Sequence, residues 1–309
     1  MIDFVGKKRW FFLISEILVV IGIVSLVISQ VQLGAPLRLG TDFTGGTSMI
    51  LQFSPPVEQS QLREEMAELG YDEARIQDAG EGNFIIYTRE ITSDEARELA
   101  GELGTELDSQ VEIIDYYLVS GTVAAETARN AVIAVIIAAV AMLFYIVWAF
   151  RRMPSPFRWG TCAIIALIHD VFIIAGIFSI LGWLAGVAID ALFITGLLAV
   201  VGYSINNTVV VFDRIRENVS RHISPDFAVT VNSSIVETLG RSLNTSLTTL
   251  FVILALFLFG GATIHYFVLV LLLGAIIGTY SSICISSQLL VVWEKRDWRV
   301  LLPFAKRTA

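Results

Sequence analysis

Charged residues are scarce in this chain. Only 16% of its 309 residues are Asp, Glu, Lys or Arg, whereas 55% are hydrophobic. Soluble globular proteins carry about 25% charged residues, so the composition excludes an ordinary soluble protein and indicates a protein of the lipid bilayer. The chain also lacks a basic stripe that could neutralise phosphates, which excludes a nucleic-acid partner.

Cysteine and histidine are also scarce, and neither forms a recognisable site. Cys162 and Cys284 lie in apolar runs, so we expect buried hydrophobic side chains rather than a disulfide framework. His169, His222 and His265 are far apart in the sequence, and no metal-ligand spacing links them. No Walker-type loop or dinucleotide fingerprint occurs. We therefore expect no metal, no cofactor and no enzyme activity, and any work would draw on an ion gradient or a partner.

Acidic residues are concentrated in one segment. Residues 31–120 contain 18 Asp or Glu and five Lys or Arg, although the net charge of the whole chain is only −8. The remaining residues therefore carry a small positive excess. This division predicts an acidic soluble module inserted into a mildly basic membrane body.

Long apolar runs occur six times. A run of about 20 residues is long enough to cross a bilayer as a helix. The expected spans lie near 10–31, 128–149, 160–182, 187–211, 240–260 and 265–292. The first run follows Lys7-Lys8-Arg9, as in a signal peptide, but it is longer than a signal and no small-residue cleavage site follows it. We interpret it as a retained helix.

The basic residues of the connecting segments predict the orientation of the spans. They gather before the first span and after the second, fourth and sixth, whereas the loops near 183–187 and 260–265 contain none. Because Lys and Arg are enriched in cytoplasmic loops, we expect both termini in the cytoplasm and the acidic module outside. The residues concerned are Lys7, Lys8, Arg9, Arg151, Arg152, Arg158, Arg214, Arg216, Arg221, Lys295, Arg296, Arg299, Lys306 and Arg307.

Short alternating elements are expected within the acidic module. Pro55-Pro56, Gly70 and the turn at 80–83 separate them, and Thr92-Ser93-Asp94-Glu95 is typical of a helix N-terminus. The expected elements are strands 47–53, 74–78, 84–87 and 111–119 and helices 58–69 and 93–107. The order βαββαβ predicts a small ferredoxin-like α+β sandwich. Its acidic surface fits either a solvated face or a face that docks a partner.

The resulting fold class is an α-helical polytopic membrane protein, with six transmembrane helices and an inserted extracytoplasmic ferredoxin-like domain. Four parts are expected: the N-terminus with the first helix (1–31), the ferredoxin-like domain (32–122), transmembrane helices two to six (123–292) and a cytoplasmic C-terminal tail (293–309). Polar side chains inside the spans are the candidate functional residues, because they are costly in hydrocarbon.

The third span contains the first candidate, His169-Asp170, near the middle of the membrane. A charged Asp170 is costly there, so it should be paired or hold a proton. The two residues fit either a structural hydrogen-bonded pair that fixes helix packing or a proton relay.

The fourth and fifth spans carry polar faces. Ser204, Asn207 and Thr208 are spaced i, i+3, i+4, so they share a face that should meet another helix. In the fifth span, Arg241 and Thr245 share a face. Arg241 fits either an interfacial residue whose charge reaches water or a buried cation facing the fourth helix, and two adjoining rows of hydroxyls favour the buried arrangement.

Small residues recur every four positions in the sixth span, at Gly274, Gly278, Ser282 and Ser286. Such a stripe lets a neighbouring helix approach closely. We interpret it as a packing feature without a chemical role.

Two motifs and two intramembrane positions resemble the SecD/SecF family, in its SecF branch. Residues 40–46 resemble the family's G-x-D-F-x-G-G motif, and residues 202–218 resemble its fourth-helix signature G-Y-S-x-N-D-T-x-V-x-x-D-R-x-R-E-N. His169-Asp170 and Arg241, with Thr245 one turn on, match the family's third and fifth helices. The matching motif residues are Gly40, Asp42, Phe43, Gly45, Gly46, Gly202, Tyr203, Ser204, Asn206, Thr208, Asp213, Arg214, Arg216, Glu217 and Asn218.

The resemblance implies a role in protein export. The family belongs to the RND superfamily, in which two six-helix halves form a twelve-helix unit, and SecD would supply the other half. The unit would use the proton motive force to assist SecYEG and the motor SecA, pulling or releasing unfolded preprotein outside the bacterial cytoplasmic membrane. YajC and YidC are further partners that the resemblance suggests.

One position departs from the family pattern, because Asn207 stands where the family has the aspartate of N-D-T. Asparagine cannot titrate, so it cannot alternate its pairing with Arg241. Three explanations remain open: a SecD aspartate carries the proton beside Asn207, Asp170 contributes more than usual, or Asn207 mimics a protonated carboxyl. A buried Arg241 without a counter-ion would cost on the order of several kcal/mol, so we expect a SecD carboxylate to compensate it.

Two other functions compete with proton-coupled export. An RND-type small-molecule efflux half-transporter would need a wider outer domain than residues 32–122 provide. A passive scaffold that stabilises SecD and SecYEG is favoured by the missing carboxylate at Asn207.

Overall fold

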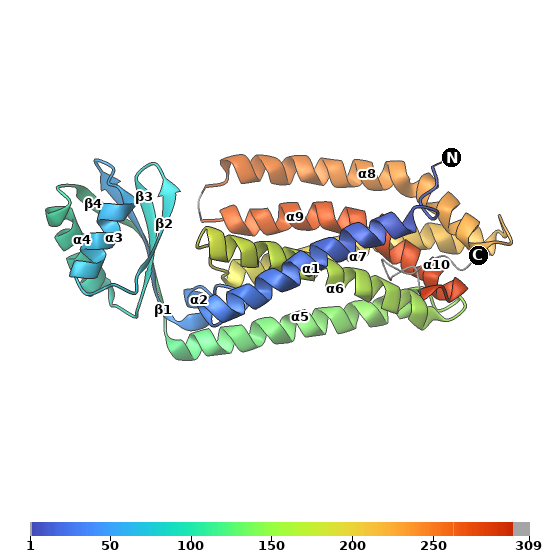
Figure 1. The fold of residues 1–309 in the computed structure, drawn as a ribbon, viewed down its shortest axis with the longest axis horizontal. Helices are drawn as coiled ribbons and strands as arrows, with labels where there is room; N and C mark the ends of the chain where they lie inside the picture. Colours follow the sequence, from blue (N-terminus) through green and yellow to red (C-terminus); the bar gives the residue numbers. More distant parts are fainter. Residues whose placement is uncertain (1, 262, 299–309) are drawn as a thin grey trace.

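The molecule has a helical bundle at one end and a small sheet domain at the other (Figure 1). A computed structural model describes residues 2–261 and 263–298. The expected C-terminal tail, 293–309, lies outside the described residues from position 299 onward. We call the end of the bundle next to the sheet domain the near end, and the opposite end the far end.

Within residues 2–261 and 263–298, six helices are long and apolar enough to cross a membrane, in agreement with the expected number. They are α1 (Lys8–Leu33), α5 (Gly121–Ala149), α6 (Pro156–Leu184), α7 (Ala191–Ser220), α8 (Phe227–Phe259) and a last helix made of α9 (His265–Ser281), the π-helical segment η1 (Ser282–Ser286) and α10 (Ser287–Lys295). The largest difference is at α8, which begins 13 residues before the expected position 240. Its first turns form because Val231 and Ile235 are buried in the bundle core and Asp226 caps the helix.

The helices of the bundle are unequally buried. About half of the apolar part of α6, α7 and the last helix is buried, whereas α5 and α8 are mostly exposed. The core at the far end includes Trp159, whose ring lies 5.2 Å from Phe150 and 5.3 Å from Phe212. The three central helices therefore provide the interior of the bundle, and α1, α5 and α8 its outer surface.

The sheet domain has the order β1, α3, β2, β3, α4, β4, which confirms the expected βαββαβ pattern. Its elements are β1 (Gly46–Ser54), α3 (Gln59–Glu68), β2 (Arg75–Gly80), β3 (Asn83–Thr88), α4 (Ser93–Glu106) and β4 (Gln110–Val119). The strands lie in the order β2-β3-β1-β4, and all three pairings are antiparallel. This is the split βαβ arrangement of a ferredoxin-like domain.

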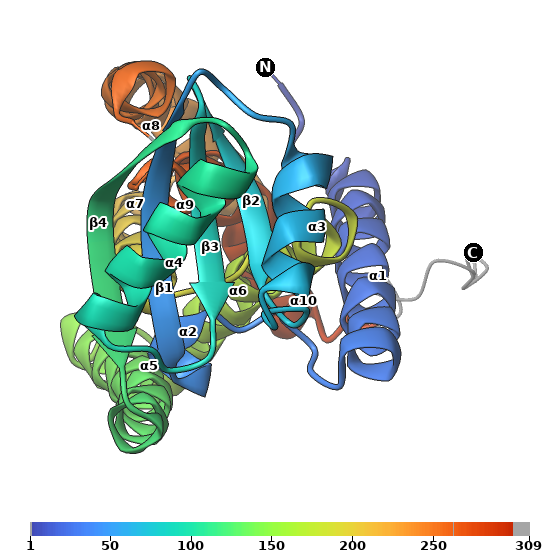
Figure 2. The same cartoon turned by 90° about the vertical axis from the view of Figure 1, so that its left-hand side faces the viewer.

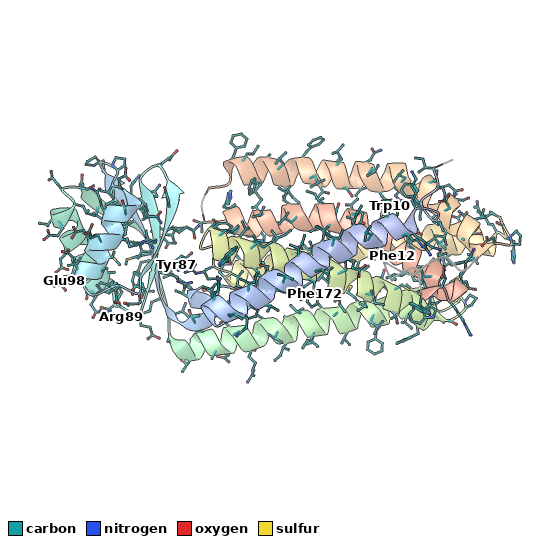
Figure 3. The ribbon with its side chains drawn as sticks, viewed as in Figure 1. Trp10, Phe12, Tyr87, Arg89, Glu98 and Phe172 are labelled. Atoms are coloured by element: carbon teal, nitrogen blue, oxygen red, sulfur yellow. The ribbon has the colours of Figure 1, made fainter. Side chains whose placement is uncertain are left out.

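One face of the sheet carries both helices, and the other turns towards the bundle (Figures 1 and 2). Met49, Leu51 and Phe53 alternate along β1 and are buried in the domain core together with Leu62 of α3 and Leu103 of α4. The predicted N-terminus of α4 is confirmed by a capping box between Thr92 and Glu95. Residues of the opposite sheet face, including Tyr87 of β3, point towards the near end of the bundle (Figure 3).

Candidate functional site

The polar centre of the bundle is Asp170, which lies midway along α6. It is the fifteenth of the 29 residues of the helix and is completely buried. At 1.5 Å per residue, its Cα lies about 21 Å from either end of α6. The expectation of an aspartate deep in the bundle is therefore confirmed.

Three side chains from three helices surround the Asp170 carboxylate. Ser204 Oγ of α7 and Ser281 Oγ of α9 both donate to Oδ2, at 2.6 and 2.7 Å. His169 Nδ1 lies 2.9 Å from Oδ1. Because hydrogen bonds to a charged acceptor are stronger than neutral ones, this shell offsets part of the desolvation cost of a buried carboxylate. The sequence prediction that Asp170 is paired is confirmed.

The same geometry gives the Asp170 site two distinct states. An ionised carboxylate accepts only, and all three contacts suit it. A protonated carboxyl must donate one hydrogen bond, so the direction of at least one hydrogen bond with His169, Ser204 or Ser281 must reverse. Protonation at Asp170 would therefore change the hydrogen bonding within this site, whose residues lie on α6, α7 and α9.

Close packing of α7 and α9 positions the two serines. A Cβ built on Gly274 would lie 2.0 Å from Val200 Cγ2, and one built on Gly278 would lie 3.1 Å from Ser204 Cβ. Only glycine fits such an approach. The small-residue stripe is thus confirmed as a packing feature, and it also brings Ser204 and Ser281 to Asp170.

Ser281 is a member of the site that sequence reasoning missed. It is fully buried and directly precedes the π-helical segment η1 (Ser282–Ser286). Single π-helical turns inside helices occur often at functional sites. The available signal was the dense run of hydroxyl residues in 279–287, an unusual composition for a buried apolar helix.

The fourth-helix motif continues this polar face along α7. Ser204, Asn207 and Thr208 are all buried, which confirms that they face other helices, whereas Asn206 and Gly202 are exposed. Among the described residues, Asn207 Nδ2 and the hydroxyl of Tyr203 have no hydrogen-bond partner. Asn207 therefore presents a buried, neutral donor one turn beyond Ser204.

The expectation that Arg241 is buried against α7 is wrong for this chain. Arg241 and Thr245 lie on the exposed face of α8, where Thr245 Oγ1 donates to the carbonyl of Arg241 at 3.0 Å. The inward face of α8 carries Ser242 and Ser246 instead, because they continue the buried stripe of Val231 and Ile235. No hydrogen bond joins Arg241 to Asn207 among residues 2–261 and 263–298.

Arg241 nevertheless lies near the level of Asp170. Ser246 Oγ and Thr279 Oγ1 are 2.7 Å apart, which aligns α8 with α9. The two helices are antiparallel, so Arg241 lies about 8 Å and Ser281 about 3 Å beyond that contact in the same direction. The guanidinium therefore lies on the outer surface of the bundle at almost the depth of the Asp170 site.

The end of the fourth-helix motif fastens α7 to α8 near the far end. Asn218 Nδ2 donates to Ser234 Oγ at 2.9 Å and to Glu237 Oε2 at 2.8 Å. Arg214 pairs with Glu237 and Glu217, at 2.5 and 2.6 Å. Arg216 pairs with Asp213 at 2.5 Å. The contacts of Asn218 and Arg214 with α8 stabilise the packing of α7 against α8, and they are separate from the Asp170 site.

The G-x-D-F-x-G-G motif forms the joint between the bundle and the sheet domain. Asp42, in the short helix α2 (Thr41–Thr44), accepts a hydrogen bond from the backbone N–H of Ala191 at 2.8 Å. Asp190 caps the same helix end by accepting from Phe193 N at 2.8 Å. Gly40 N donates to the carbonyl of Ile189 at 2.8 Å. The segment before β1 is therefore tied directly to the first turn of α7.

The two consecutive glycines of the motif allow the chain to turn from this joint into β1. Gly45 and Gly46 have φ angles of +77° and +116°, a region that L side chains rarely adopt. A Cβ on Gly46 would lie 2.5 Å from the carbonyl oxygen of Thr88, and a Cβ on Gly45 would lie 3.1 Å from Gly121 Cα. The two glycines therefore allow the start of β1 to lie close to the backbone of β3 and to the start of α5.

A polar cavity of about 220 Å³ lies between the joint and the sheet, and Asp42, Asp115, Asp190 and Tyr87 help to line it. Burial, and then the nearby charge of Asp42, raise the pKa of Asp190 above its usual value. Burial and the neighbouring Asp190 raise the pKa of Tyr87 to about 12. Within the described part of the chain, no three His, Cys, Asp or Glu side chains are grouped so that they could hold a metal ion.

These observations define the class of protein: a polytopic membrane protein with a ferredoxin-like domain joined to the start of a polar central helix. Two family models match the chain. The model described as "Protein export membrane protein SecD/SecF, C-terminal" matches residues 100–296, and the "SecD/SecF GG Motif" model matches residues 32–57. The chain belongs to the SecD/SecF family.

Full-length relatives place it in the SecF branch of that family. It is 42% identical to the protein translocase subunit SecF of Thermobaculum terrenum, with 96% of each chain covered. It is 39% identical to the SecF of Anaerolinea thermophila, with 97% of this chain and 96% of the relative covered.

Solved structures of SecDF share the fold. The crystal structure of SecDF from Thermus thermophilus matches 96% of this chain at 34% identity, with a TM-score of 0.84. SecDF in a super-membrane-facing form matches the same share at 33% identity, with a TM-score of 0.65. This chain spans only 39% of each SecDF chain.

Proposed function

We propose that this protein is a non-enzymatic subunit of the protein-export machinery that works with SecD and the proton motive force. It lies in the bacterial cytoplasmic membrane with both termini in the cytoplasm and the sheet domain outside. The basic far-end segments support this orientation, since Lys and Arg are enriched on the cytoplasmic side. SecYEG with SecA is the machinery that it assists, and the unfolded preprotein is its cargo.

The observation that carries the proposal is the three-helix shell around Asp170. Proton entry to the carboxylate replaces an acceptor with a donor and reverses the direction of at least one hydrogen bond with Ser204, Ser281 or His169. A switch requires such a bistable element, whose two arrangements differ in contacts. Asp170 thereby assumes the titrating role that Asn207 cannot perform.

The helix α7 connects this switch with the sheet domain. Ser204 lies 13 residues from Ala191, about 20 Å along the helix, and Ala191 N is held by Asp42. A shift of α7 at Ser204 is therefore passed to the G-x-D-F-x-G-G joint. The two SecDF structures match this chain with TM-scores of 0.84 and 0.65, and this difference supports the proposed movement.

Arg241 supports pairing with SecD. An exposed guanidinium at the depth of the Asp170 site would be costly against lipid. A carboxylate from the SecD half covers it and supplies the counter-ion that this chain lacks at Asn207. Replacing Arg241 by Met should abolish proton-dependent export without unfolding the chain, because Arg241 is exposed on α8.

The test is export into proteoliposomes that contain SecYEG, SecD and this chain, with SecA and ATP supplied. The proton motive force should stimulate export with the unaltered chain and with the control Glu98→Gln, whose side chain is exposed on α4 (Figure 3). Asp170→Asn should export at the unstimulated rate. Stimulation of Asp170→Asn equal to that of the control would refute the proposed role of Asp170.

A passive scaffold is the second candidate, and the buried, non-titrating Asn207 favours it. A scaffold predicts that export depends on the presence of the chain but not on the proton motive force. It also predicts equal export for the unaltered chain and Asp170→Asn. The same proteoliposome experiment separates the two candidates.

A further inference from the structure

A basic pocket lies between the sheet domain and the near end of the bundle. It has a volume of about 430 Å³ and lies where β2 and α3 meet the segment that follows α6. Arg38, Arg63 and Arg75 line it, together with Gln59, Gln77 and Trp183. Three of the five basic residues in the acidic segment 31–120 thus meet at one place. We call it the arginine pocket.

The charge of the arginine pocket is not neutralised by the protein. Among the described residues, no ion pair includes Arg38, Arg63 or Arg75. Arg38 Nη1 donates to the carbonyl of Gly182 at 3.3 Å, and Arg75 Nη1 donates to that of Leu39 at 3.2 Å. A guanidinium has five N–H donors, so most remain available. Arg38 and Arg75 line the same pocket, and burial, and then the charge of Arg38, lower the pKa of Arg75.

The arginine pocket lies next to the ends of two helices that are long and apolar enough to cross a membrane. Helices α1 and α6 end beside it, at Leu33 and Leu184. Trp183 and Leu184 are 47% and 67% exposed, and Val31 on the outer face of α1 is 80% exposed. Tryptophan is enriched where hydrocarbon meets water. Apolar surface suited to acyl chains therefore continues directly from the pocket.

We propose that the arginine pocket binds the phosphate-bearing headgroup of an anionic phospholipid, whose acyl chains lie along α1 and Trp183. Guanidinium groups match phosphate oxygens with paired hydrogen bonds, and the volume of the pocket suits a small headgroup. A free anion or an acidic peptide would leave the adjoining apolar surface unused. The lipid would bridge Arg38, at the end of the bundle, and Arg63 of the sheet domain, so it would hold β2 and α3 close to the membrane. This inference does not depend on the export mechanism.

The test uses the purified full-length chain in detergent, titrated with phosphatidylglycerol and measured by native mass spectrometry. Arg63→Gln is the main variant, because its exposed side chain makes no hydrogen bond within the described residues. Arg97→Gln is the matched control, since Arg97 is an exposed arginine of the same domain that pairs with Asp94 at 2.6 Å. We expect Arg63→Gln to weaken binding about fivefold and Arg63→Gln with Arg75→Gln to weaken it further, with Arg97→Gln unchanged.

Competition identifies the source of the phosphate. Phosphatidylglycerol should bind more tightly than phosphatidylcholine, and millimolar inorganic phosphate should not displace it. Equal phosphatidylglycerol binding by Arg63→Gln and Arg97→Gln would overturn the proposal. Displacement by inorganic phosphate, or tighter binding of a polyglutamate peptide than of the lipid, would also overturn it. Thermal unfolding of each variant checks that the fold is retained.

Discussion

Substitutions of Asp170 separate the hydrogen bonding that the structure shows from the proton transfer that we propose. In Asp170→Asn, the amide oxygen can accept from Ser204 and Ser281, which now lie 2.6 and 2.7 Å from Oδ2. The amide NH₂ can donate to His169 Nδ1, because the other ring nitrogen, Nε2, has no partner and can carry the proton. In Asp170→Leu, all three partners lose their acceptor or donor.

The magnitudes follow from which partners are left unsatisfied. A buried polar group without a hydrogen bond costs about 1–3 kcal/mol. Ser281 keeps a long contact with the carbonyl of Gly278, at 3.3 Å, and the His169 side chain is 10% exposed, so their losses are reduced. Ser204 has no such alternative among its described contacts. We expect Asp170→Leu to lower the free energy of unfolding by about 2–4 kcal/mol and Asp170→Asn by less than about 1 kcal/mol.

The assay is denaturant unfolding of the purified chain in detergent micelles, followed by circular dichroism. Asp226→Asn serves as a control, because Asp226 is an exposed N-cap and asparagine caps equally well. If Asp170→Leu is as stable as the unaltered chain, the three hydrogen bonds do not offset the burial of the carboxylate. The reasoning about the Asp170 site would then be refuted.

Four further predictions test other parts of the structure. Gly46→Ala should destabilise the sheet domain by at least about 2 kcal/mol, seen as faster hydrogen exchange in 46–119, because its Cβ would meet the Thr88 carbonyl at 2.5 Å; unchanged exchange would contradict this. Gly274→Ala should cost about 1–3 kcal/mol in thermal unfolding, since α9 would be forced away from Val200; an unaltered melting temperature would show that the helices are not in close contact. Asp190→Asn should stabilise the chain at pH 7, because the folded-state pKa of Asp190 is raised. The charged carboxylate therefore lowers the stability of the unaltered chain above that pKa, and this cost disappears below the ordinary pKa of aspartate. The melting temperatures of the variant and the unaltered chain should converge at acidic pH, and a difference that stays constant with pH would contradict this. Glu98→Cys should react with a membrane-impermeant maleimide added outside intact cells, because native Cys162 and Cys284 are buried; labelling only after lysis would reverse the proposed orientation.

The sequence predicted the elements of the fold well, because each has a strong local signal. Six apolar runs identify the spans, since few other structures tolerate 20 such residues. The alternation in β1 and the capping box at Thr92 identify the sheet domain. The early start of α8 was not predicted, because residues 227–239 are too polar to indicate a membrane span. They are helical in the structure because Val231 and Ile235 are buried in the bundle core.

The candidate site was only partly predictable, for a related reason. Asp170 and Ser204 stand out as polar residues within apolar helices, and they do meet. Ser281 did not stand out, because serine is common at helix contacts and its role depends on how α9 packs against α7. The orientation of Arg241 was mispredicted because the spacing of Arg241, Thr245 and Thr248 describes one face of α8 but not the neighbour it meets. In the structure, the adjacent face of α8, which carries Ser242 and Ser246, packs against the bundle.

The motif at 40–46 shows a further limit of sequence reasoning. Its residues match the family, but the sequence does not show what they contact. The structure places Asp42 at the first turn of α7, about 150 residues away along the chain. The glycines add two positive φ angles that no local pattern specifies. The motif therefore works as a joint, and the pattern alone does not show which elements it connects.

Proton flux through vesicles that contain this chain and SecD tests the central claim most directly. The account predicts flux with the unaltered chain, because it assigns proton transfer to Asp170 rather than to Asn207, and loss of flux in Asp170→Asn with the SecD complex intact. Asn207→Asp provides a reference that restores the usual family carboxylate. Flux only in Asn207→Asp, or equal flux in Asp170→Asn and the unaltered chain, would contradict the account.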